Sequence, residues 1–307
     1  MGIPSNMAQI LLREHNYRAF AGNLLSIAQQ TVYLHPASAI ALVKHECGKL
    51  NVGHFIESDD ATRGSADQDY ITDRSFYSLF CGMKYISMDV SGYEGADLIW
   101  DLCQPIPCEL EDRFDIIYNG GCLDNIFDAA TAIKNMSRML RPGGRIFHLE
   151  RSSRVHHAYL AYSLAWFHDY YALNNFADCK VYLTLWDNSR ESPWDLYYYN
   201  PLMTKGDGTL EFYGQDRAYD ARRQSHVVVI AEKGENSTWQ HNPVQFQYRG
   251  PDAADPASAY VSSSMRFALH ARPLLRFAGQ PPAQDRQYVP CGVADALATL
   301  RSAAALE

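Results

Sequence analysis

The sequence predicts an α/β fold with a seven-stranded, mostly parallel sheet covered by helices on both faces, and three observations support this. The stretch from Phe114 to Glu150 contains an apolar strand, a polar turn, a helix with 3.6-residue periodicity and a second strand. Short apolar runs of strand length recur on both sides of this unit, and helical segments separate most of them. The apolar fraction of 47% and the charged fraction of 20% are those of an ordinary globular protein.

Local signals give the bounds of the elements. The second expected helix has Pro36 in its first turn and Gly48 after its end. Asp124-Asn125 is expected to cap the third helix, and Pro142-Gly143-Gly144 is expected to end it. Helices are expected at residues 7–18, 36–47, 125–141 and 158–176, and strands at 23–27, 84–89, 96–101, 114–118, 145–149, 180–186 and 226–232.

Two segments lie outside this regular alternation. An insertion after the first strand, at about residues 51–83, is polar except for an amphipathic helix around Phe76 to Phe80. It is either a substrate lid or a solvated loop, and its place at the ligand edge of the sheet favours the lid. The main domain is therefore expected to cover residues 1–234, with a C-terminal extension at 235–301. Within the extension 251–264 resembles a loop and 293–300 a short helix, and residues 302–307 resemble a vector-derived tail.

Composition excludes several classes of function. The net charge of −8 argues against a dedicated nucleic-acid surface, and no apolar run approaches the roughly 20 residues that span a bilayer. The N-terminal stretch lacks the pattern of a secretory signal. Seven scattered cysteines without a C-x-x-C pair indicate free thiols in a reducing cytoplasm, and no ligand cluster for a metal is evident. A small-molecule substrate is expected, and a homodimer is left open.

The run FDIIYNGG…LRPGGRIFH, from Phe114 to His148, resembles the fourth strand, the following helix and the fifth strand of class I S-adenosylmethionine-dependent methyltransferases. Its most specific part is LRPGGR before a strand. The resemblance spans about residues 20–235 and implies a Rossmann-like sheet, S-adenosylmethionine as cofactor, and a last strand inserted antiparallel beside the sixth. One departure is clear, because the glycine-rich loop of the family is replaced by Ala28-Gln29-Gln30-Thr31.

The resemblance implies an adenosine site at two strand ends. Asp89 ends the second strand, where a carboxylate accepts hydrogen bonds from the vicinal hydroxyls of a ribose. The alternative is an Asp that only caps a turn. Asp101 with Leu102 ends the third strand, where the family contacts the adenine amino group and a ring nitrogen. The alternative there is an Asp that only begins the turn at Gln104.

The methionine end is expected at two turns. Asn119, Gly120 and Gly121 follow the fourth strand, where glycines let backbone carbonyls approach a sulfonium and an Asn amide orients an amine or a hydroxyl. A simple strand-to-helix turn is the alternative. Gln29, Gln30 and Thr31 are candidates to hold the carboxylate and ammonium of the methionine tail, unless this turn has lost its ligand.

Aromatic and histidine side chains supply further candidates. Helical spacing places an aromatic stripe on one helix face, which either attracts a sulfonium by cation–π interaction or packs on the sheet. Tyr170 and Tyr171 at its end are catalytic candidates with Asn119, and a second aromatic wall is expected at 197–199. His148, His156 or a tyrosine is the candidate general base. The stripe consists of Tyr159, Tyr162, Trp166 and Tyr170.

These observations favour a methyltransferase that transfers a methyl group from the sulfonium to a small molecule by SN2 displacement. Two alternatives stay open. In the first, the amine of S-adenosylmethionine attacks its own γ-carbon, which gives a four-membered cyclic amino acid and methylthioadenosine. In the second, the chain is a non-catalytic binding protein that keeps only the fold, which the altered turn at 28–31 would explain.

Overall fold

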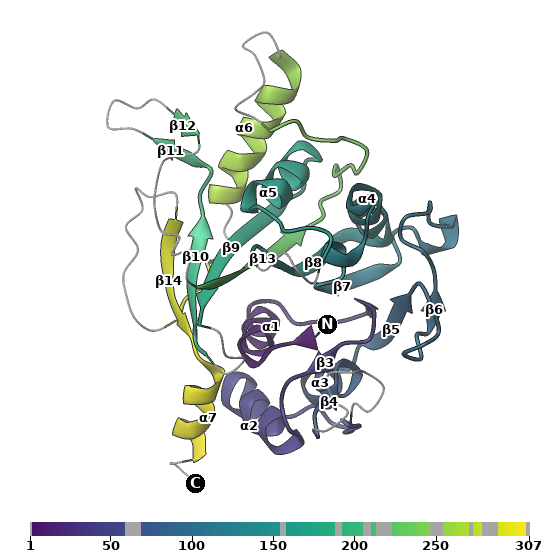
Figure 1. Cartoon of the computed structure of the whole chain (residues 1–307), viewed down its shortest axis with the longest axis vertical. Coiled ribbons are helices and arrows are strands. Elements are labelled where there is room, and N and C mark those ends of the chain that lie inside the picture. The colour runs from purple at the N-terminus through teal and green to yellow at the C-terminus, as the bar shows by residue number, and fades with distance from the viewer. Residues whose placement is uncertain are drawn as a thin grey trace.

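A nine-stranded sheet forms the centre of the chain (Figure 1). The computed structural model describes residues 2–58, 69–153, 158–187, 192–204, 210–212, 223–245, 254–269, 273–277 and 288–304. From one edge of the sheet to the other, the strands are β14 (Tyr288–Ala294), β10 (Trp194–Tyr199), β9 (Asp178–Trp186), β13 (Gln224–Glu232), β8 (Leu140–Arg151), β7 (Phe114–Gly120), β2 (Asn23–Ile27), β5 (Lys84–Asp89) and β6 (Leu98–Ile99).

All seven predicted strands are present in this sheet, and two were not predicted. Strands β6, β5, β2, β7 and β8 pair in parallel, and β13 runs antiparallel between β8 and β9. The unpredicted strands β10 and β14 extend the sheet beyond β9 by antiparallel pairing. Residues 197–199, expected as an aromatic wall, belong to β10. β6 is shorter than predicted, whereas β8 is longer and includes Pro142-Gly143-Gly144.

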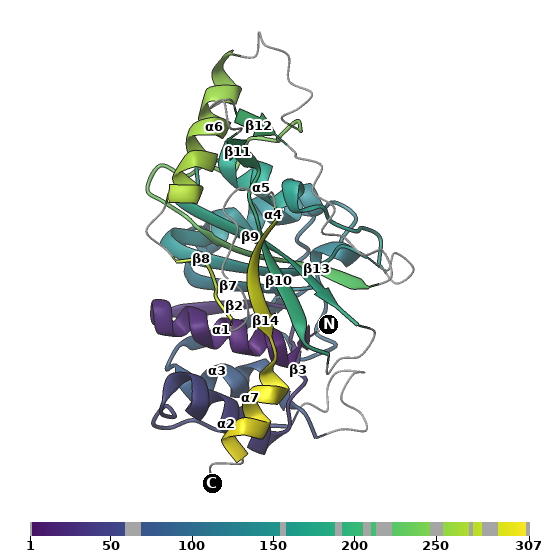
Figure 2. The ribbon, with the colours of Figure 1, turned by 90° about the vertical axis from the view of Figure 1, so that its left-hand side faces the viewer.

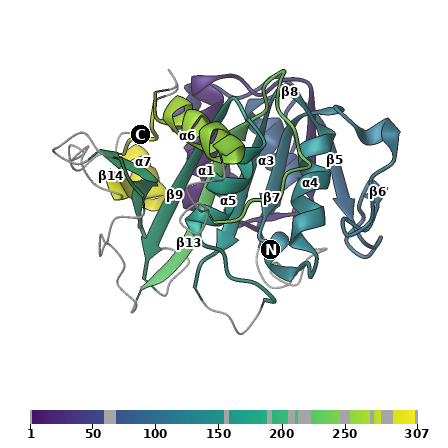
Figure 3. The ribbon, with the colours of Figure 1, turned by 90° about the horizontal axis from the view of Figure 1, so that it is seen from above.

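Two helical layers cover the sheet, and each buries its own hydrophobic core (Figures 1 and 2). One layer contains α4 (Ala129–Met139), α5 (Leu164–Leu173) and α6 (Ala254–Leu269), which Figure 3 shows from above. The opposite layer contains α1 (Ser5–Tyr17), α2 (Pro36–Cys47), α3 (Asp73–Phe80) and α7 (Ala296–Ala304). This arrangement confirms the α/β class with helices on both faces.

The helix ends follow the sequence signals only in part. α2 begins at Pro36 and is followed by Gly48 at φ 75°, as predicted. α4 is capped by Asp128, whose side chain accepts a hydrogen bond from the Thr131 amide, so the predicted cap at Asp124-Asn125 is wrong. Residues 123–125 instead form the short 3₁₀ helix η2 (Leu123–Asn125), in which the Asn125 amide donates to the Cys122 carbonyl at 3.0 Å. A second 3₁₀ turn, η1 (Cys108–Leu110), precedes β7.

The described part of the insertion is built into the fold. A small three-stranded sheet joins β1 (Gly2–Ile3), β3 (Thr31–Val32) and β4 (Ile71–Thr72), and α3 follows directly. Phe76, Leu79 and Phe80 of α3 are buried against the first strands of the main sheet and against α2. The lid prediction is therefore wrong for residues 71–80, while 59–68 lie outside the described residues.

The C-terminal extension completes the same sheet. It supplies α6, β14 and α7, so the loop expected at 251–264 is helical from Ala254 onward. Tyr260 and Phe267 of α6 are buried, and packing of this kind overrides a weak local helix signal. α7 lies against α2, and the Ala296 amide donates to Asn6 Oδ1 at 2.9 Å. A two-stranded ribbon, β11 (Leu202–Thr204) with β12 (Leu210–Phe212), lies between β10 and β13 in the sequence.

Two glycines with positive φ offer a matched test of the packing. Gly22→Ala should cost about 2 kcal/mol more stability than Gly48→Ala in urea unfolding, although both substitutions force a side chain into the left-handed region. A Cβ at Gly22 would overlap the carboxylate of Asp115, which accepts from Asn23 N at 2.6 Å and pairs with Arg141. A Cβ at Gly48 meets nothing within 4 Å. Equal losses for the two variants would contradict this account.

Candidate functional site

The carboxyl ends of β2, β5 and β7 meet at one edge of the sheet. The Ala28 amide donates to the Met88 carbonyl at 2.7 Å, which ties the turn after β2 to the end of β5. The Cys122 thiol donates to the Ile27 carbonyl at 3.1 Å, which ties the turn after β7 to the same place. Open α/β sheets bind ligands where such strand ends converge.

The turn that replaces the expected glycine-rich loop is built around a buried glutamine. Ala28 has φ 57°, a left-handed backbone of the kind that glycine normally supplies. The Gln30 side chain is fully buried and donates through Nε2 to the Ile27 carbonyl at 2.7 Å. A Cβ on Gly120 would lie 2.7 Å from Gln30 Oε1, so only glycine fits there. Gln30 Oε1 accepts no hydrogen bond from any described residue.

A buried aspartate from α3 supports this turn. Asp73 accepts hydrogen bonds from Ser26 Oγ and Tyr85 Oη, both at 2.7 Å. Its backbone amide donates to the Gln30 carbonyl at 3.0 Å. Burial raises the pKa of the Asp73 carboxyl to about 7, although these hydrogen bonds oppose the shift. The insertion therefore contributes a buried carboxyl group that supports the turn from below.

The three predicted residues of this turn lie in different environments. Gln29 is half-buried, Gln30 is enclosed between β2 and β7, and Thr31 is buried in the small sheet, where it pairs with Gly2 and Thr72. Gln29 and Gln30 therefore lie where the strand ends converge, whereas Thr31 belongs to the small sheet.

The predicted adenosine residues lie on the open side of the edge. Asp89 is half-buried, and its Oδ1 accepts from the Ser91 amide at 3.0 Å, while no described residue engages its Oδ2. Asp101 is exposed, and its Oδ1 accepts from the Cys103 amide at 2.8 Å. Leu102 is buried, and its carbonyl accepts from Asn135 Nδ2. The exposed apolar side chains Val90 and Ile99 lie on the strand ends beside Asp89.

Asn119, His148 and Tyr171 form a continuous buried network. Asn119 Nδ2 donates to His148 Nδ1 at 2.9 Å and to Glu150 Oε1 at 2.6 Å, and His148 Nε2 lies 2.6 Å from Tyr171 Oη. Burial lowers the pKa of His148 to about 3, so its ring is neutral and inaccessible. The structure therefore corrects the expectation of a general base at His148. We interpret these side chains as positioning residues.

Glu150 is the member of this network that the sequence analysis missed. Its carboxyl group accepts from the Leu123 amide at 3.1 Å and from the Asp124 amide at 3.2 Å, so it holds η2. Burial and the neighbouring Asp124 raise the pKa of Glu150 well above its usual value. Burial also raises the pKa of Asp124 to about 6, although Arg151, whose Nε lies 3.2 Å from Asp124 Oδ2, opposes this shift. The two-residue alternation of side chains along a strand could have revealed Glu150. It places His148 and Glu150 on the same face of β8, and His148 lies opposite Asn119 on β7.

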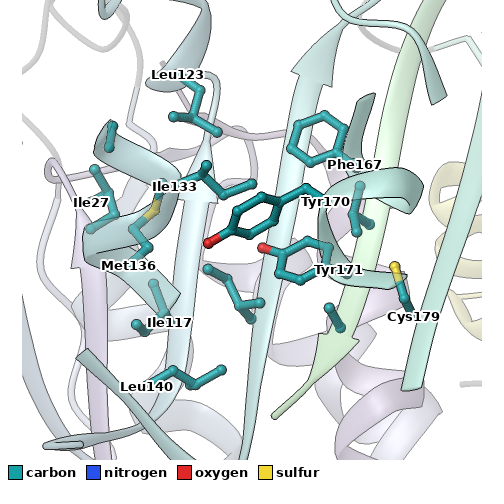
Figure 4. Close-up of a cluster of buried hydrophobic side chains, with 14 of the residues drawn as sticks. Ile27, Ile117, Leu123, Ile133, Met136, Leu140, Phe167, Tyr170, Tyr171 and Cys179 are labelled. Carbon is teal, nitrogen blue, oxygen red and sulfur yellow. The ribbon is translucent and has the colours of Figure 1, made fainter. Parts of the chain in front are cut away.

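The aromatic stripe lies mainly in the hydrophobic core. Tyr162 and Tyr170 are buried and Trp166 is half-buried, with the ring of Tyr170 between α4 and α5 (Figure 4). Tyr170 Oη donates to Ser137 Oγ at 3.1 Å, so this tyrosine faces away from the strand ends. Tyr159 precedes α5 and is 71% exposed. His156, the other candidate base, lies outside the described residues.

Comparison with known proteins finds a methyltransferase family that is similar to part of the chain. Residues 89–190 match the sequence model of the ubiE/COQ5 methyltransferase family. The matched third of the chain contains β7, α4 and β8, and β13 lies antiparallel between β8 and β9 as the resemblance implied. The match shows that this part of the chain is similar to that methyltransferase family.

Several solved structures of methyltransferases resemble the chain. The citrinin polyketide synthase CMeT domain is 11% identical with a TM-score of 0.38, and the match covers 75% of this chain and 52% of that one. Phosphoethanolamine N-methyltransferase 2 of Haemonchus contortus is 13% identical with a TM-score of 0.39, and the match covers 76% and 54%. 1,6-Didemethyltoxoflavin-N1-methyltransferase of Burkholderia thailandensis is 14% identical with a TM-score of 0.30, and the match covers 75% and 78%.

The chain thus spans about half the length of the first two of these methyltransferase structures. No curated protein matches its sequence. Among the described residues, no helix is both long and apolar enough to cross a membrane. The same residues contain no group of three or more His, Cys, Asp or Glu side chains arranged to hold a metal ion.

The buried Asp73 carboxyl group under the turn should make the stability of the folded chain depend on pH. Because the pKa of Asp73 is raised in the folded state, the unfolded chain loses this proton first as pH rises from about 4 to 7. The contribution of Asp73 to stability therefore falls over this range. Relative to the wild type, Asp73→Asn should gain about 2.5 kcal/mol of stability in urea unfolding between pH 5 and pH 8, because about two pH units lie between pH 5 and the folded-state pKa of about 7. The exposed Glu235→Gln variant is the control, and a constant difference between wild type and Asp73→Asn would contradict the assignment.

Proposed function

We propose that the chain binds S-adenosylmethionine at the convergence of β2, β5 and β7 and transfers its methyl group to a small molecule in the cytoplasm. The observation that carries the proposal is a pair of acceptor oxygens at this edge. Asp89 Oδ2 is unengaged by any described residue at one strand end, and Gln30 Oε1 is buried without a described donor between the other two. Hydroxyl and ammonium groups of the cofactor would donate to these two oxygens.

The adenosine half fits the open side of this edge. Asp89 is the acceptor for the ribose hydroxyls, and Val90 and Ile99 offer apolar surface to the base. Asp101 and the backbone of Leu102 are proposed to contact the edge of the base. The hydrogen bond from Asn135 to the Leu102 carbonyl holds this segment in place before any ligand binds.

The methionine half fits the rebuilt turn. Gln30 Oε1 would accept from the ammonium group, and Gln29 would reach the carboxylate. Thr31 lies beneath the turn and is proposed to position these two side chains. Gly120 and Gly121 let the backbone after β7 approach the ligand, and Gly121 has φ 75°.

S-adenosylmethionine supplies an electrophilic methyl group on a sulfonium, and the protein's task is to hold an acceptor in line with it. Asn119 is committed to its buried contacts, so its part is to fix the start of the turn after β7. His148 and Tyr171 extend that support toward α5. The net charge of −8 supports a small molecule rather than a nucleic acid as acceptor, and seven free thiols support a reducing compartment.

The Asp89 assignment predicts a loss of cofactor affinity. Asp89→Asn should raise the Kd for S-adenosylhomocysteine by about tenfold to a hundredfold in calorimetry, because a charged acceptor for two hydroxyls is replaced by a neutral amide. Asp112→Asn is the matched control, since Asp112 precedes β7 and so lies at the opposite end of the parallel strands from Asp89. Wild-type affinity in the Asp89 variant would place the ribose elsewhere.

The reaction itself is tested with S-adenosylmethionine alone and with a mixture of small metabolites. Incubated alone, S-adenosylmethionine should stay intact while S-adenosylhomocysteine binds tightly. With a deuterated methyl donor and the mixture, mass spectrometry should show S-adenosylhomocysteine and a labelled small molecule. Methylthioadenosine formed without an acceptor would establish a cyclase or lyase reaction instead. Failure to bind either adenosyl ligand would establish a non-catalytic protein.

A further inference from the structure

The turn at residues 28–31 is held from below by a row of three oxygen atoms. Ser26 Oγ lies 2.7 Å from Asp73 Oδ2 on one side and 2.9 Å from the Ala28 carbonyl oxygen on the other. Ser26 and Asp73 are fully buried and Ala28 is almost so, which places the row in the interior. Among the described residues, no other group donates a hydrogen bond to the Ala28 carbonyl.

Both contacts in this row are hydrogen bonds only when the Asp73 carboxyl group carries a proton. Two hydrogen bonds between three oxygen atoms require two protons, and the Ser26 hydroxyl supplies one of them. A protonated Asp73 donates to Ser26 Oγ, which leaves the serine proton for the Ala28 carbonyl. An ionised Asp73 is the stronger acceptor and takes the serine proton, so the Ala28 carbonyl loses its donor. Burial raises the pKa of this carboxyl group to about 7, so both states occur near neutral pH.

The Ala28 carbonyl belongs to the residue on which the shape of the turn depends. Ala28 has φ 57°, a conformation that an L-residue keeps only where its surroundings hold it. Two residues later, the Gln30 carbonyl accepts from the Asp73 amide at 3.0 Å, and Gln30 Oε1 is the proposed acceptor for the ammonium group of the cofactor. Asp73 therefore acts on a ligand through the turn, because its own side chain is not exposed at the edge of the sheet.

Three tyrosines and an arginine are the titratable groups next to Asp73 in the described part of the chain. Burial raises the pKa of each tyrosine hydroxyl well above its usual value, so all three are neutral between pH 5 and pH 9. Arg74 directs its guanidinium group to the Asp97 carboxylate, at 2.8 and 3.0 Å. The tyrosines are Tyr77 of α3, Tyr85 of β5 and Tyr118 of β7.

We propose that Asp73 is a positioning residue for the cofactor, and that its proton completes the hydrogen-bonded row that keeps the turn at 28–31 in its binding conformation. Loss of this proton to solvent frees the Ala28 carbonyl, and the fraction of molecules with a competent turn falls. The apparent affinity for a ligand falls with that fraction. This inference rests on the proposed function, because it concerns the methionine end of the cofactor bound at this turn.

The test measures the Kd for S-adenosylhomocysteine by calorimetry between pH 6 and pH 8. The wild-type Kd should rise about tenfold over this range, because the protonated fraction of a group with a pKa of about 7 falls from about nine-tenths to about one-tenth. Asp73→Asn should keep the affinity that the wild type has at pH 6, since its amide donates to Ser26 Oγ and keeps an oxygen for Tyr85. Glu235→Gln, at an exposed position, is the control and should keep the wild-type pH dependence.

Two further variants test the row itself and serve if Asp73→Asn does not fold. Ser26→Ala removes the donor to the Ala28 carbonyl in both states of Asp73, so its Kd should be about tenfold higher than the wild-type value at pH 6 and no longer change with pH. Tyr85→Phe removes a hydrogen bond that favours the ionised carboxylate, so the midpoint of the pH dependence should rise by about one pH unit. A role of Asp73 in folding alone would not move this midpoint.

The possible results separate this inference from the proposed function. A wild-type Kd that stays constant or falls between pH 6 and pH 8 would overturn the inference and leave the cofactor site in place. The same pH dependence in a folded Asp73→Asn would also overturn it, and would assign the effect to Asp124 or Glu150, which contact η2. No binding by the wild type at any pH would overturn the proposed function and this inference together.

Discussion

The buried carboxyl group of Glu150 is the contact on which the geometry of the carboxyl edge depends. It reaches from β8 to Asn119 on β7 and to two backbone amides of η2, so it sets the position of the turn after β7. The two η2 amides would be left without a partner in a dry interior if the carboxyl group were absent. His148, two residues earlier on the same face of β8, extends the network to Tyr171 and so joins the sheet to α5.

The turn after β2 shows how a sheet edge is built without glycine. A glycine-rich loop leaves bare backbone next to a ligand, whereas this chain places the Gln30 side chain in that space. Ala28 takes a left-handed backbone conformation that costs an L-residue about 1 kcal/mol. Hydrogen bonds from Ser26 and from the Asp73 amide offset this cost. The support comes from α3, so the insertion and the altered turn belong to one structural solution.

The central strands could be predicted because their signals are local. Residues 23–27, 84–89 and 226–232 are apolar runs bounded by polar or turn residues, and each occurs as a strand. β10 and β14 were missed because their pairing joins residues almost a hundred positions apart and because Pro290 argues against a strand. In α6, serine-rich sequence indicated a loop, but burial of Tyr260 and Phe267 decides the outcome.

The same distinction between local signals and long-range contacts applies to the candidate site. Asp89, Asn119 and Gly120 could be found because a residue at the end of a parallel strand must lie at the ligand edge. Their orientation could not be found, since it depends on partners far away in the sequence. The Asn119 amide donates to Glu150, and the position of Asp73 under Ser26 follows from packing of α3 that no local pattern encodes.

The contact between the first and last helices has a consequence for how the chain is made. The Asn6 side chain accepts from Ala296 N, and Gln9 donates to Thr299, so partners nearly three hundred residues apart close the fold. α1 emerges early in synthesis yet cannot complete its packing until the last helix has left the ribosome. Until β14 arrives, β10 presents an unpaired edge with three consecutive tyrosines. A chain that lacks β14 and α7 would therefore keep this edge unpaired and be prone to aggregate.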